Sequence, residues 1–133
     1  MATEDTVYLT VQDAVKLHVL YMRRVGETRF GVFDKNLVES AISRPRHAAA
    51  FQEADLIRQA ATLLFGLIKN HPWEGGNKRT ATFLTTVFLK RNGMRLVSNT
   101  DEIVETCLKI EADDWKVDEI DAWLRTKVRH AVE

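Results

Sequence analysis

The centre of the chain, residues 54–80, reads ADLIRQAATLLFGLIKNHPWEGGNKRT. Apolar side chains in its first part recur three and four positions apart, as in a helix that buries one face. We therefore predict a helix over about 54–69. The next helix is predicted to run from Asn77 to Arg91, where Gly93 follows and can end it. The apolar face of the first of these helices consists of Leu56, Ile57, Ala60, Leu63, Leu64, Leu67 and Ile68.

Similar patterns on both sides of this centre predict four more helices. Thr10 and Asp13 are spaced as a capping box at the start of the first one. A second helix is capped by Asp34 and is expected to stop before Pro45, because proline disrupts a helix interior. The sequence thus predicts an all-α fold, a compact single domain of residues 1–133 with about six helices. The four outer helices are expected at about 11–25, at 34–44, from 100 and from 114, with a short extended segment at 94–97.

Composition narrows the class of protein. The chain has 133 residues, 45% of them hydrophobic and 29% charged, which suits one globular domain. Its 19 Lys and Arg balance its 19 Asp and Glu, so nucleic-acid binding through overall charge is disfavoured. Cys107 is the single cysteine, which excludes a disulfide framework, and no apolar run is long enough for a membrane span. We expect a cytoplasmic protein that contacts neither membrane nor, directly, nucleic acid.

Residues 71–80, HPWEGGNKRT, carry the candidate chemistry. Pro72 disfavours helical geometry at the preceding residue, so His71 is predicted to project from a loop. Gly75 and Gly76 lack side chains and permit positive φ, which lets backbone N–H groups turn toward one point.

The start of the following helix is predicted to bind an anion. Its first N–H groups are unpaired, and Lys78 and Arg79 add positive charge although they oppose the helix dipole. A phosphate chain fits such a site. A neutral imidazole at His71 can take a proton from a hydroxyl while the cations stabilise the phosphate being transferred. The residues therefore predict attack of a protein Ser, Thr or Tyr hydroxyl on a nucleotide phosphate.

Other interpretations of the same residues were compared with this one. Residues 76–80, GNKRT, lack the spacer of a Walker A loop, and no apolar strand precedes them. A helix-turn-helix DNA-binding protein is supported only by a Gly-Gly turn before a helix, and the neutral charge opposes it. A helical binding module without catalysis is a further alternative.

Residues 71–81, HPWEGGNKRTA, resemble the Fic/Doc signature, H-P-F-x-[D/E]-G-N-[G/K]-R-T. Trp73 stands where the signature has phenylalanine, and Lys78 is the variant typical of the death-on-curing (Doc) branch. The resemblance covers nearly the whole chain and implies a Fic-like fold. It extends to residues 17–18, to residues 37–41 with Pro45, and to residues 89–93.

The resemblance implies a role for each matched position. His71 would be the general base, and Arg79 would hold nucleotide phosphate. Gly76 and Asn77 would form the anion hole. Lys78 would mark a kinase that moves the γ-phosphate of ATP to a threonine of elongation factor Tu and blocks translation. Relatives with glycine at that position mostly transfer AMP, so an AMP transferase (AMPylase) is the alternative.

The resemblance also implies partners. Residues 43–50 would be a flap that aligns the target peptide, with Arg44, Arg46 and His47 as its contact residues. Toxins of this kind are normally restrained by an antitoxin. The family's internal inhibitory pattern, Ser/Thr-x-x-x-Glu-Gly/Asn, has no match, because the one Glu-Gly pair, at Glu74, lacks Ser or Thr four positions earlier. We therefore expect the antitoxin to be a separate chain.

One position departs from the signature. The acidic residue that ligates Mg²⁺ in the family is Gly75 here. Because Mg²⁺ is usually held by one or two carboxylates plus phosphate oxygens, this loss is expected to weaken metal and ATP binding. The adjacent Glu74 is the candidate replacement. The glycine is equally compatible with an impaired enzyme that acts as a binding module.

Overall fold

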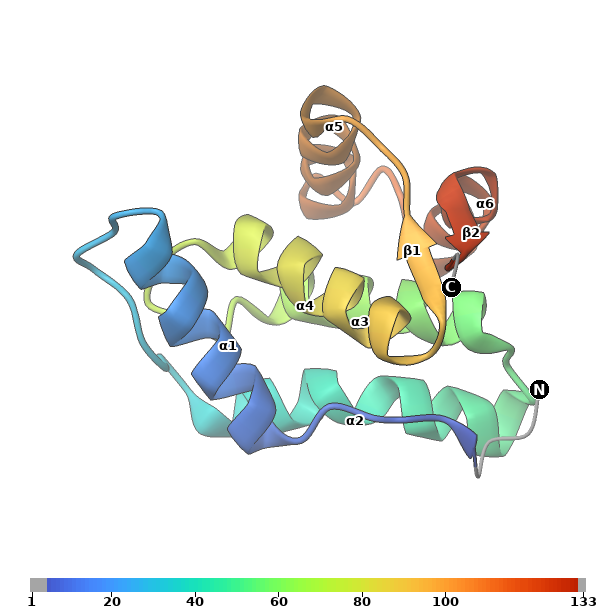
Figure 1. The fold of residues 1–133 in the computed structure, drawn as a ribbon, viewed down its shortest axis with the longest axis horizontal. Coiled ribbons are helices and arrows are strands. Elements are labelled where there is room, and N and C mark those ends of the chain that lie inside the picture. The colour runs from blue at the N-terminus through green and yellow to red at the C-terminus, as the bar shows by residue number, and fades with distance from the viewer. Residues whose placement is uncertain (1–4, 132–133) are drawn as a thin grey trace.

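The computed structural model describes residues 5–131 of the chain. These residues form six helices and one two-stranded sheet, which confirms the all-α prediction. None of their helices combines the length and apolarity that crossing a bilayer demands. The elements are α1 (Val11–Arg24), α2 (Lys35–Gln52), α3 (Leu56–Asn70), α4 (Asn77–Arg91), β1 (Met94–Leu96), α5 (Thr100–Glu111), α6 (Val117–Lys127) and β2 (Val128–His130) (Figure 1).

Helix α3 is the centre of the fold. It packs against α2, α4, α5 and α6, so it is covered on almost every side. The apolar stripe predicted for this segment is buried, and burial of such side chains is the main force that stabilises a small domain. Both ends of α3 are thereby fixed, including the end that leads into the histidine loop. The buried residues of α3 include Leu56, Ala60, Leu63, Leu64, Leu67 and Ile68.

The predicted start of α1 and the predicted extended segment are both confirmed. The hydroxyl of Thr10 accepts the backbone N–H of Asp13 at 3.0 Å, and the Asp13 carboxylate accepts the N–H of Thr10 at 3.1 Å. Strand β1 pairs antiparallel with β2, with Met94 opposite His130.

The prediction that the second helix stops before Pro45 is wrong. Helix α2 continues through Pro45 to Gln52, with the proline inside it. A buried stripe continues on both sides of the proline and packs against α3, so tertiary packing outweighs the lost hydrogen bond. The stripe consists of Val38, Ala41, Ile42, Pro45, Ala48 and Ala49.

The last helix begins at Val117 rather than near Asp114. Asp113 adopts a φ of 65°, which ends the preceding helical path. The N–H groups of Asp114 and Trp115 both donate to the carbonyl of Lys109, at 2.9 and 3.1 Å, so these residues close a turn. Helix α6 therefore starts three residues later than predicted.

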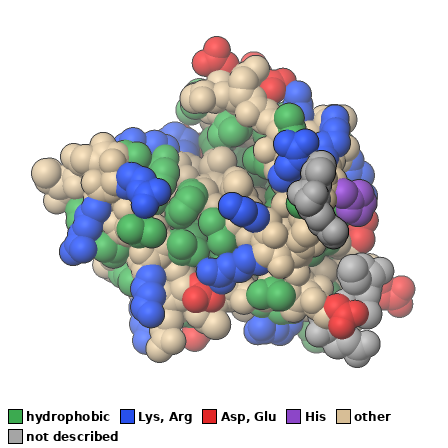
Figure 2. Space-filling view, in the orientation of Figure 1, with side chains coloured by type: hydrophobic (Ala, Val, Ile, Leu, Met, Phe, Trp, Pro, Cys, Tyr) green, Lys and Arg blue, Asp and Glu red, His purple; other side chains and the backbone are tan. Residues whose placement is uncertain are grey.

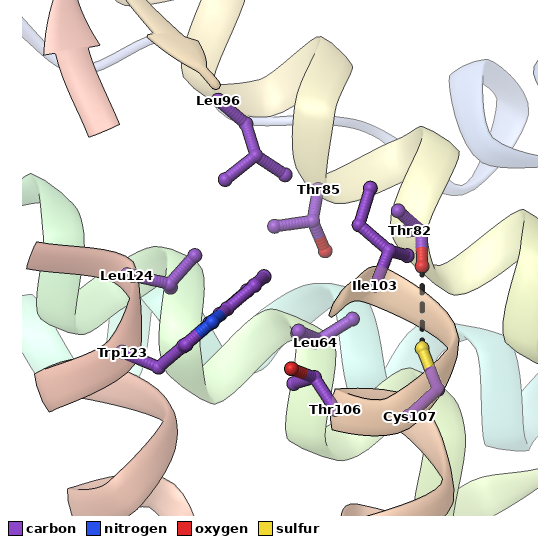
Figure 3. Close-up of a pocket in the computed structure, with 9 residues that line it drawn as sticks. All are labelled: Leu64, Thr82, Thr85, Leu96, Ile103, Thr106, Cys107, Trp123 and Leu124. Atoms are coloured by element: carbon purple, nitrogen blue, oxygen red, sulfur yellow. Dashed lines mark hydrogen bonds between the residues drawn. The ribbon is translucent and has the colours of Figure 1, made fainter. Parts of the chain in front are cut away.

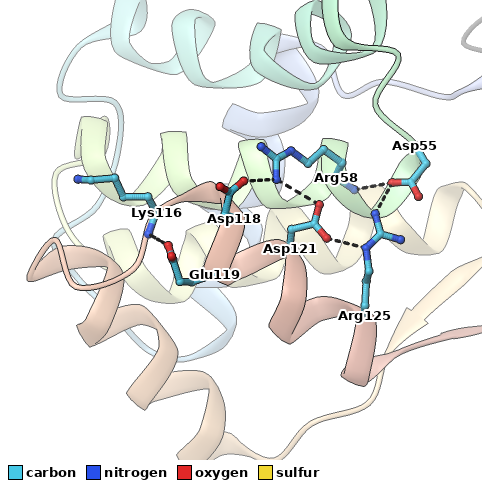
Figure 4. Close-up of polar contacts among 7 residues, drawn as sticks. All are labelled: Asp55, Arg58, Lys116, Asp118, Glu119, Asp121 and Arg125. Atoms are coloured by element: carbon cyan, nitrogen blue, oxygen red, sulfur yellow. Dashed lines mark hydrogen bonds and ion pairs between the residues drawn. The ribbon is translucent and has the colours of Figure 1, made fainter.

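Ion pairs attach α6 to the first turn of α3 (Figure 4). Nη1 of Arg58 lies 2.7 Å from Asp118 and 3.4 Å from Asp121. On the other side of the same network, Arg125 contacts Asp121 at 2.6 Å and Asp55 at 2.9 Å. Two arginines and three carboxylates thus alternate across the contact between the two helices.

Helix α5 is attached through a small apolar contact region (Figure 3). Side chains from α3, α4, α5 and α6 meet there, and the Cys107 thiol lies 3.4 Å from the hydroxyl of Thr82. The space they enclose is about 10 Å³, which is too small for a ligand. Burial raises the pKa of the Cys107 thiol, consistent with a packing role. Helix α5 is thus held in place with its C-terminal end toward the histidine loop, since its last residue, Glu111, contacts His71.

Candidate active site

The histidine loop follows directly from α3, as predicted. His71 ends the helix with a φ of 48° and a ψ of 57°, a left-handed geometry that turns the chain away from the helix axis. Its side chain is half exposed. Two residues later Trp73 is buried, and its ring stacks on that of His18 with 4.3 Å between centroids. The loop is anchored by the tryptophan and leaves the imidazole accessible.

Gly76 precedes the first residue of α4 and requires glycine for two reasons. Its φ is 64°, and a Cβ atom there would lie 2.6 Å from Cε of Met22. The side chain of Asn77 closes the loop, since it accepts the N–H of Trp73 at 3.0 Å and donates to the same residue's carbonyl at 3.1 Å. The side chain expected at the anion hole therefore holds the loop in shape. The backbone at the start of α4 is what Asn77 can offer an anion.

Each of the two cations at the start of α4 has a carboxylate partner. Nζ of Lys78 lies 3.3 Å from both oxygens of Glu111, and Nη2 of Arg79 lies 3.0 Å from Glu27. The same Glu111 carboxylate lies 3.4 Å from Nε2 of His71. One carboxylate therefore contacts both the predicted base and a predicted phosphate ligand. The structure brings the imidazole and the basic helix start together.

Residues 26–34 lie along the histidine loop. The N–H of Phe33 donates to the carbonyl of Pro72 at 2.9 Å, and the N–H of Glu74 donates to that of Gly31 at 2.8 Å. These contacts form an isolated antiparallel bridge next to the candidate base. The segment between α1 and α2, rather than part of α2, is thus the strand-like neighbour of the site.

The prediction that residues 43–50 form a flap is wrong, because this segment is helical. Arg44 and Arg46 place their guanidinium groups 5.4 Å over Phe65 and 4.6 Å over Tyr8, respectively. His47 packs edge-on against exposed Phe51 within α2. These three side chains lie on the middle of α2, two or more helical turns beyond the end that contacts the loop.

His18 supports the site from the buried side. The N–H of Gly31 donates to its Nε2 at 3.1 Å, so this nitrogen carries no proton. The hydrogen bonds therefore assign the proton to Nδ1, which donates to the hydroxyl of Thr80 at 2.8 Å. Burial lowers the pKa of His18 to about 4. One neutral histidine thus connects α1, residues 26–34 and the first turn of α4.

No carboxylate stands at the signature's metal position. A Cβ atom on Gly75 would lie 3.0 Å from the carbonyl oxygen of Arg29, so the loop is fitted to glycine. Glu74 is exposed. Within residues 5–131, no three His, Cys, Asp or Glu side chains gather in a ready metal site.

An apolar groove of about 390 Å³ lies between α1 and α5, with α4 as its floor. Tyr21 and Phe83 stack there with 4.9 Å between ring centroids, and Val104 lines the opposite side. Lys78 and Arg79 lie at its edge. Figure 2 shows hydrophobic side chains at the surface where these helices meet.

Three features of the site were not predicted. Glu111 comes from α5, and its proximity to His71 depends on the path of three intervening elements. Glu27 pairs with Arg79 from the segment between α1 and α2. The role of that segment had a signal, since Gly26 and Gly31 interrupt the helical pattern before a capping aspartate.

Fold and site together define a class of helical proteins in which a histidine loop precedes a basic helix that starts at glycine. Comparison with known proteins places the chain within this class. The model of the Fic/DOC family matches residues 8–89, so the chain belongs to the Fic/DOC family, and it resembles the Doc branch. Members of this family are enzymes of the kinase or transferase kind.

Two relatives illustrate the similarity. The chain is 28% identical over 95 residues to "Protein kinase doc" of Escherichia phage P1, a match that covers 71% of this chain and 75% of that protein. It is 37% identical over 82 residues to "Toxin Doc" of Mycolicibacterium smegmatis, covering 57% of this chain and 63% of that relative.

Proposed function

We propose that this protein is a Doc-type toxin that transfers the γ-phosphate of ATP to a hydroxyl of a protein. The observation that carries the proposal is the contact of one carboxylate, Glu111, with both His71 and Lys78. It places a half-exposed imidazole beside the cations at the start of α4. The name of the phage P1 relative, a protein kinase, supports the same reaction.

In the proposed reaction, His71 takes the proton of the target hydroxyl as its oxygen attacks the γ-phosphorus. The bond from that phosphorus to the bridging oxygen breaks, and ADP leaves. Lys78, Arg79 and the free N–H groups of α4 stabilise the negative charge on the phosphates. A threonine of elongation factor Tu is the proposed acceptor, and its phosphorylation would block translation.

Mg²⁺ is the proposed cofactor alongside ATP. When bound, it neutralises charge on the phosphates. Because Mg²⁺ at a nucleotide takes only one or two carboxylates from the protein, a site without a three-residue cluster fits it. Glu111 is the carboxylate that contacts the predicted phosphate ligand Lys78.

The proposed partner is an antitoxin supplied as a separate chain. We propose that it lies in the groove between α1 and α5, because the groove is apolar and has cations at its edge. An amphipathic helix with acidic residues at one end fits this combination. A partner seated there would cover Lys78 and Arg79 and so restrict nucleotide binding.

A transfer assay with ATP labelled on the γ-phosphate and elongation factor Tu tests the reaction. His71→Ala is expected to reduce transfer by about 10²–10⁴-fold, because it removes the base. His47→Ala, on the middle of α2, is the matched control and is expected to leave transfer unchanged. Gly75→Asp is expected to increase transfer, with Gly75→Ala as the control for the added Cβ atom near Arg29.

Two results would contradict the proposal or redirect it. If Gly75→Asp binds ATP and still transfers nothing, the kinase proposal fails and a binding module is favoured. Mass spectrometry of the modified target separates the second candidate reaction, since it distinguishes an added phosphate from an added adenylate.

A further inference from the structure

Glu111 occupies an unusual position in the site. It is the last residue of α5 and lies beyond residues 8–89, the part of the chain that matches the family model. Its side chain is about one-third exposed, and it contacts both His71 and Lys78. The contribution of this carboxylate is therefore additional to the signature motif.

A nucleotide phosphate on Lys78 would come close to this carboxylate. Two anions at such a distance in a partly buried site repel each other strongly. The repulsion is relieved if the carboxylate withdraws, or if a divalent cation lies between the carboxylate and the phosphate. The second arrangement suits a cation that usually takes few protein ligands and several phosphate and water oxygens.

The motif itself offers no competing carboxylate at its metal position. Gly75 has none, and the carbonyl of Arg29 occupies the space next to it. Glu74 is exposed, and its backbone is bonded to Gly31. Glu111 is the acidic side chain that the described residues place against both the candidate base and the candidate phosphate ligand.

We infer that Glu111 is the protein ligand for the divalent cation that accompanies the nucleotide phosphates. The inference rests on the proposed function, because it assumes that a nucleotide phosphate binds at Lys78. Helix α5 then supplies the carboxylate that the signature loop lacks. In the absence of nucleotide, the same carboxylate is held by Lys78.

Calorimetric titration with ATP, with and without Mg²⁺, tests this inference. The proteins compared are the wild type, Glu111→Gln and the matched control Glu105→Gln, which changes an exposed carboxylate on the same helix. Wild type and control are expected to bind ATP about tenfold or more tightly with Mg²⁺. Glu111→Gln is expected to lose this gain, and to bind metal-free ATP more tightly than the wild type.

A second readout follows the ion directly. With Mn²⁺ in place of Mg²⁺, the electron paramagnetic resonance spectrum of the protein–ATP complex is expected to differ between wild type and Glu111→Gln. The two spectra report whether a carboxylate ligand has been lost. Circular dichroism and thermal unfolding check that each variant is folded.

Each other outcome has a defined meaning. The same Mg²⁺ gain in Glu111→Gln would overturn the inference, and so would equally tighter ATP binding with and without Mg²⁺, which would make Glu111 only a counterion of Lys78. If ATP binds and Arg79→Ala weakens it, but Glu111→Gln changes nothing, this inference alone fails. If the wild type binds no ATP under either condition, the proposed function fails as well.

Discussion

Buried His18 supports the loop that carries the candidate base. Its ring stacks on Trp73, accepts the N–H of Gly31 and donates to Thr80. These contacts require the neutral imidazole, since protonation would place a proton on the nitrogen that accepts from Gly31. The protonation state of one residue is thus linked to the geometry of three segments around the site.

The stability of the protein is expected to fall at acid pH because of His18. Its pKa is about 4 in the folded protein and ordinarily 6.5, so the unfolded chain binds more protons between these values. The free energy of unfolding is therefore full above pH 6.5 and falls by about 3 kcal/mol as the pH drops to 4. Urea unfolding of wild type and His18→Gln across this range measures the contribution.

His47→Gln is the matched control, because His47 is exposed on α2. The control is expected to keep the acid sensitivity of the wild type, whereas His18→Gln flattens it between pH 6.5 and 4. Identical pH profiles for wild type and His18→Gln would show that His18 is not held neutral by the fold.

Local chemistry made part of the site predictable from the sequence. Proline after His71 and glycine before Asn77 constrain their own neighbours, so the loop and the helix start follow from adjacent residues. Glu111 and Glu27 reach the site through tertiary packing, which no local pattern encodes. His18 is a buried polar residue whose partners all come from other segments.

At the scale of elements, the difference between expectation and structure lies in α2. Pro45 lowers the intrinsic tendency of this segment to be helical, yet the stripe around it is buried against α3. Packing decides the outcome where local propensity and burial conflict. The flap predicted at residues 43–50 failed for the same reason, and residues 26–34 take the place beside the loop.

The groove between α1 and α5 gives a prediction at this scale. Val104→Asp places a charge on its apolar wall and is expected to weaken binding of the co-expressed antitoxin by about tenfold or more. Val104 is about half exposed, so the substitution leaves the core intact. Val97→Asp, equally exposed but outside the groove lining, is the control. Unchanged affinity in Val104→Asp, measured by calorimetry, would exclude the groove as the docking site.

At the scale of the whole molecule, the fold brings residues from distant parts of the chain to one place. Helix α3 holds the histidine loop at one end, α4 starts immediately after the loop, and α5 ends against both (Figure 1). The central claim is that His71 and the start of α4 act on a single nucleotide. This claim depends on their proximity and is independent of which group is transferred.

Nuclear magnetic resonance titration with ATP and Mg²⁺ tests the central claim most directly. The ring signals of His71 and the amide signals of Asn77, Lys78 and Arg79 are expected to shift together and saturate with one dissociation constant. The signals of His47 are expected to stay in place. Shifts at His47 without shifts at the start of α4, or different dissociation constants for His71 and for the α4 amides, would contradict the account.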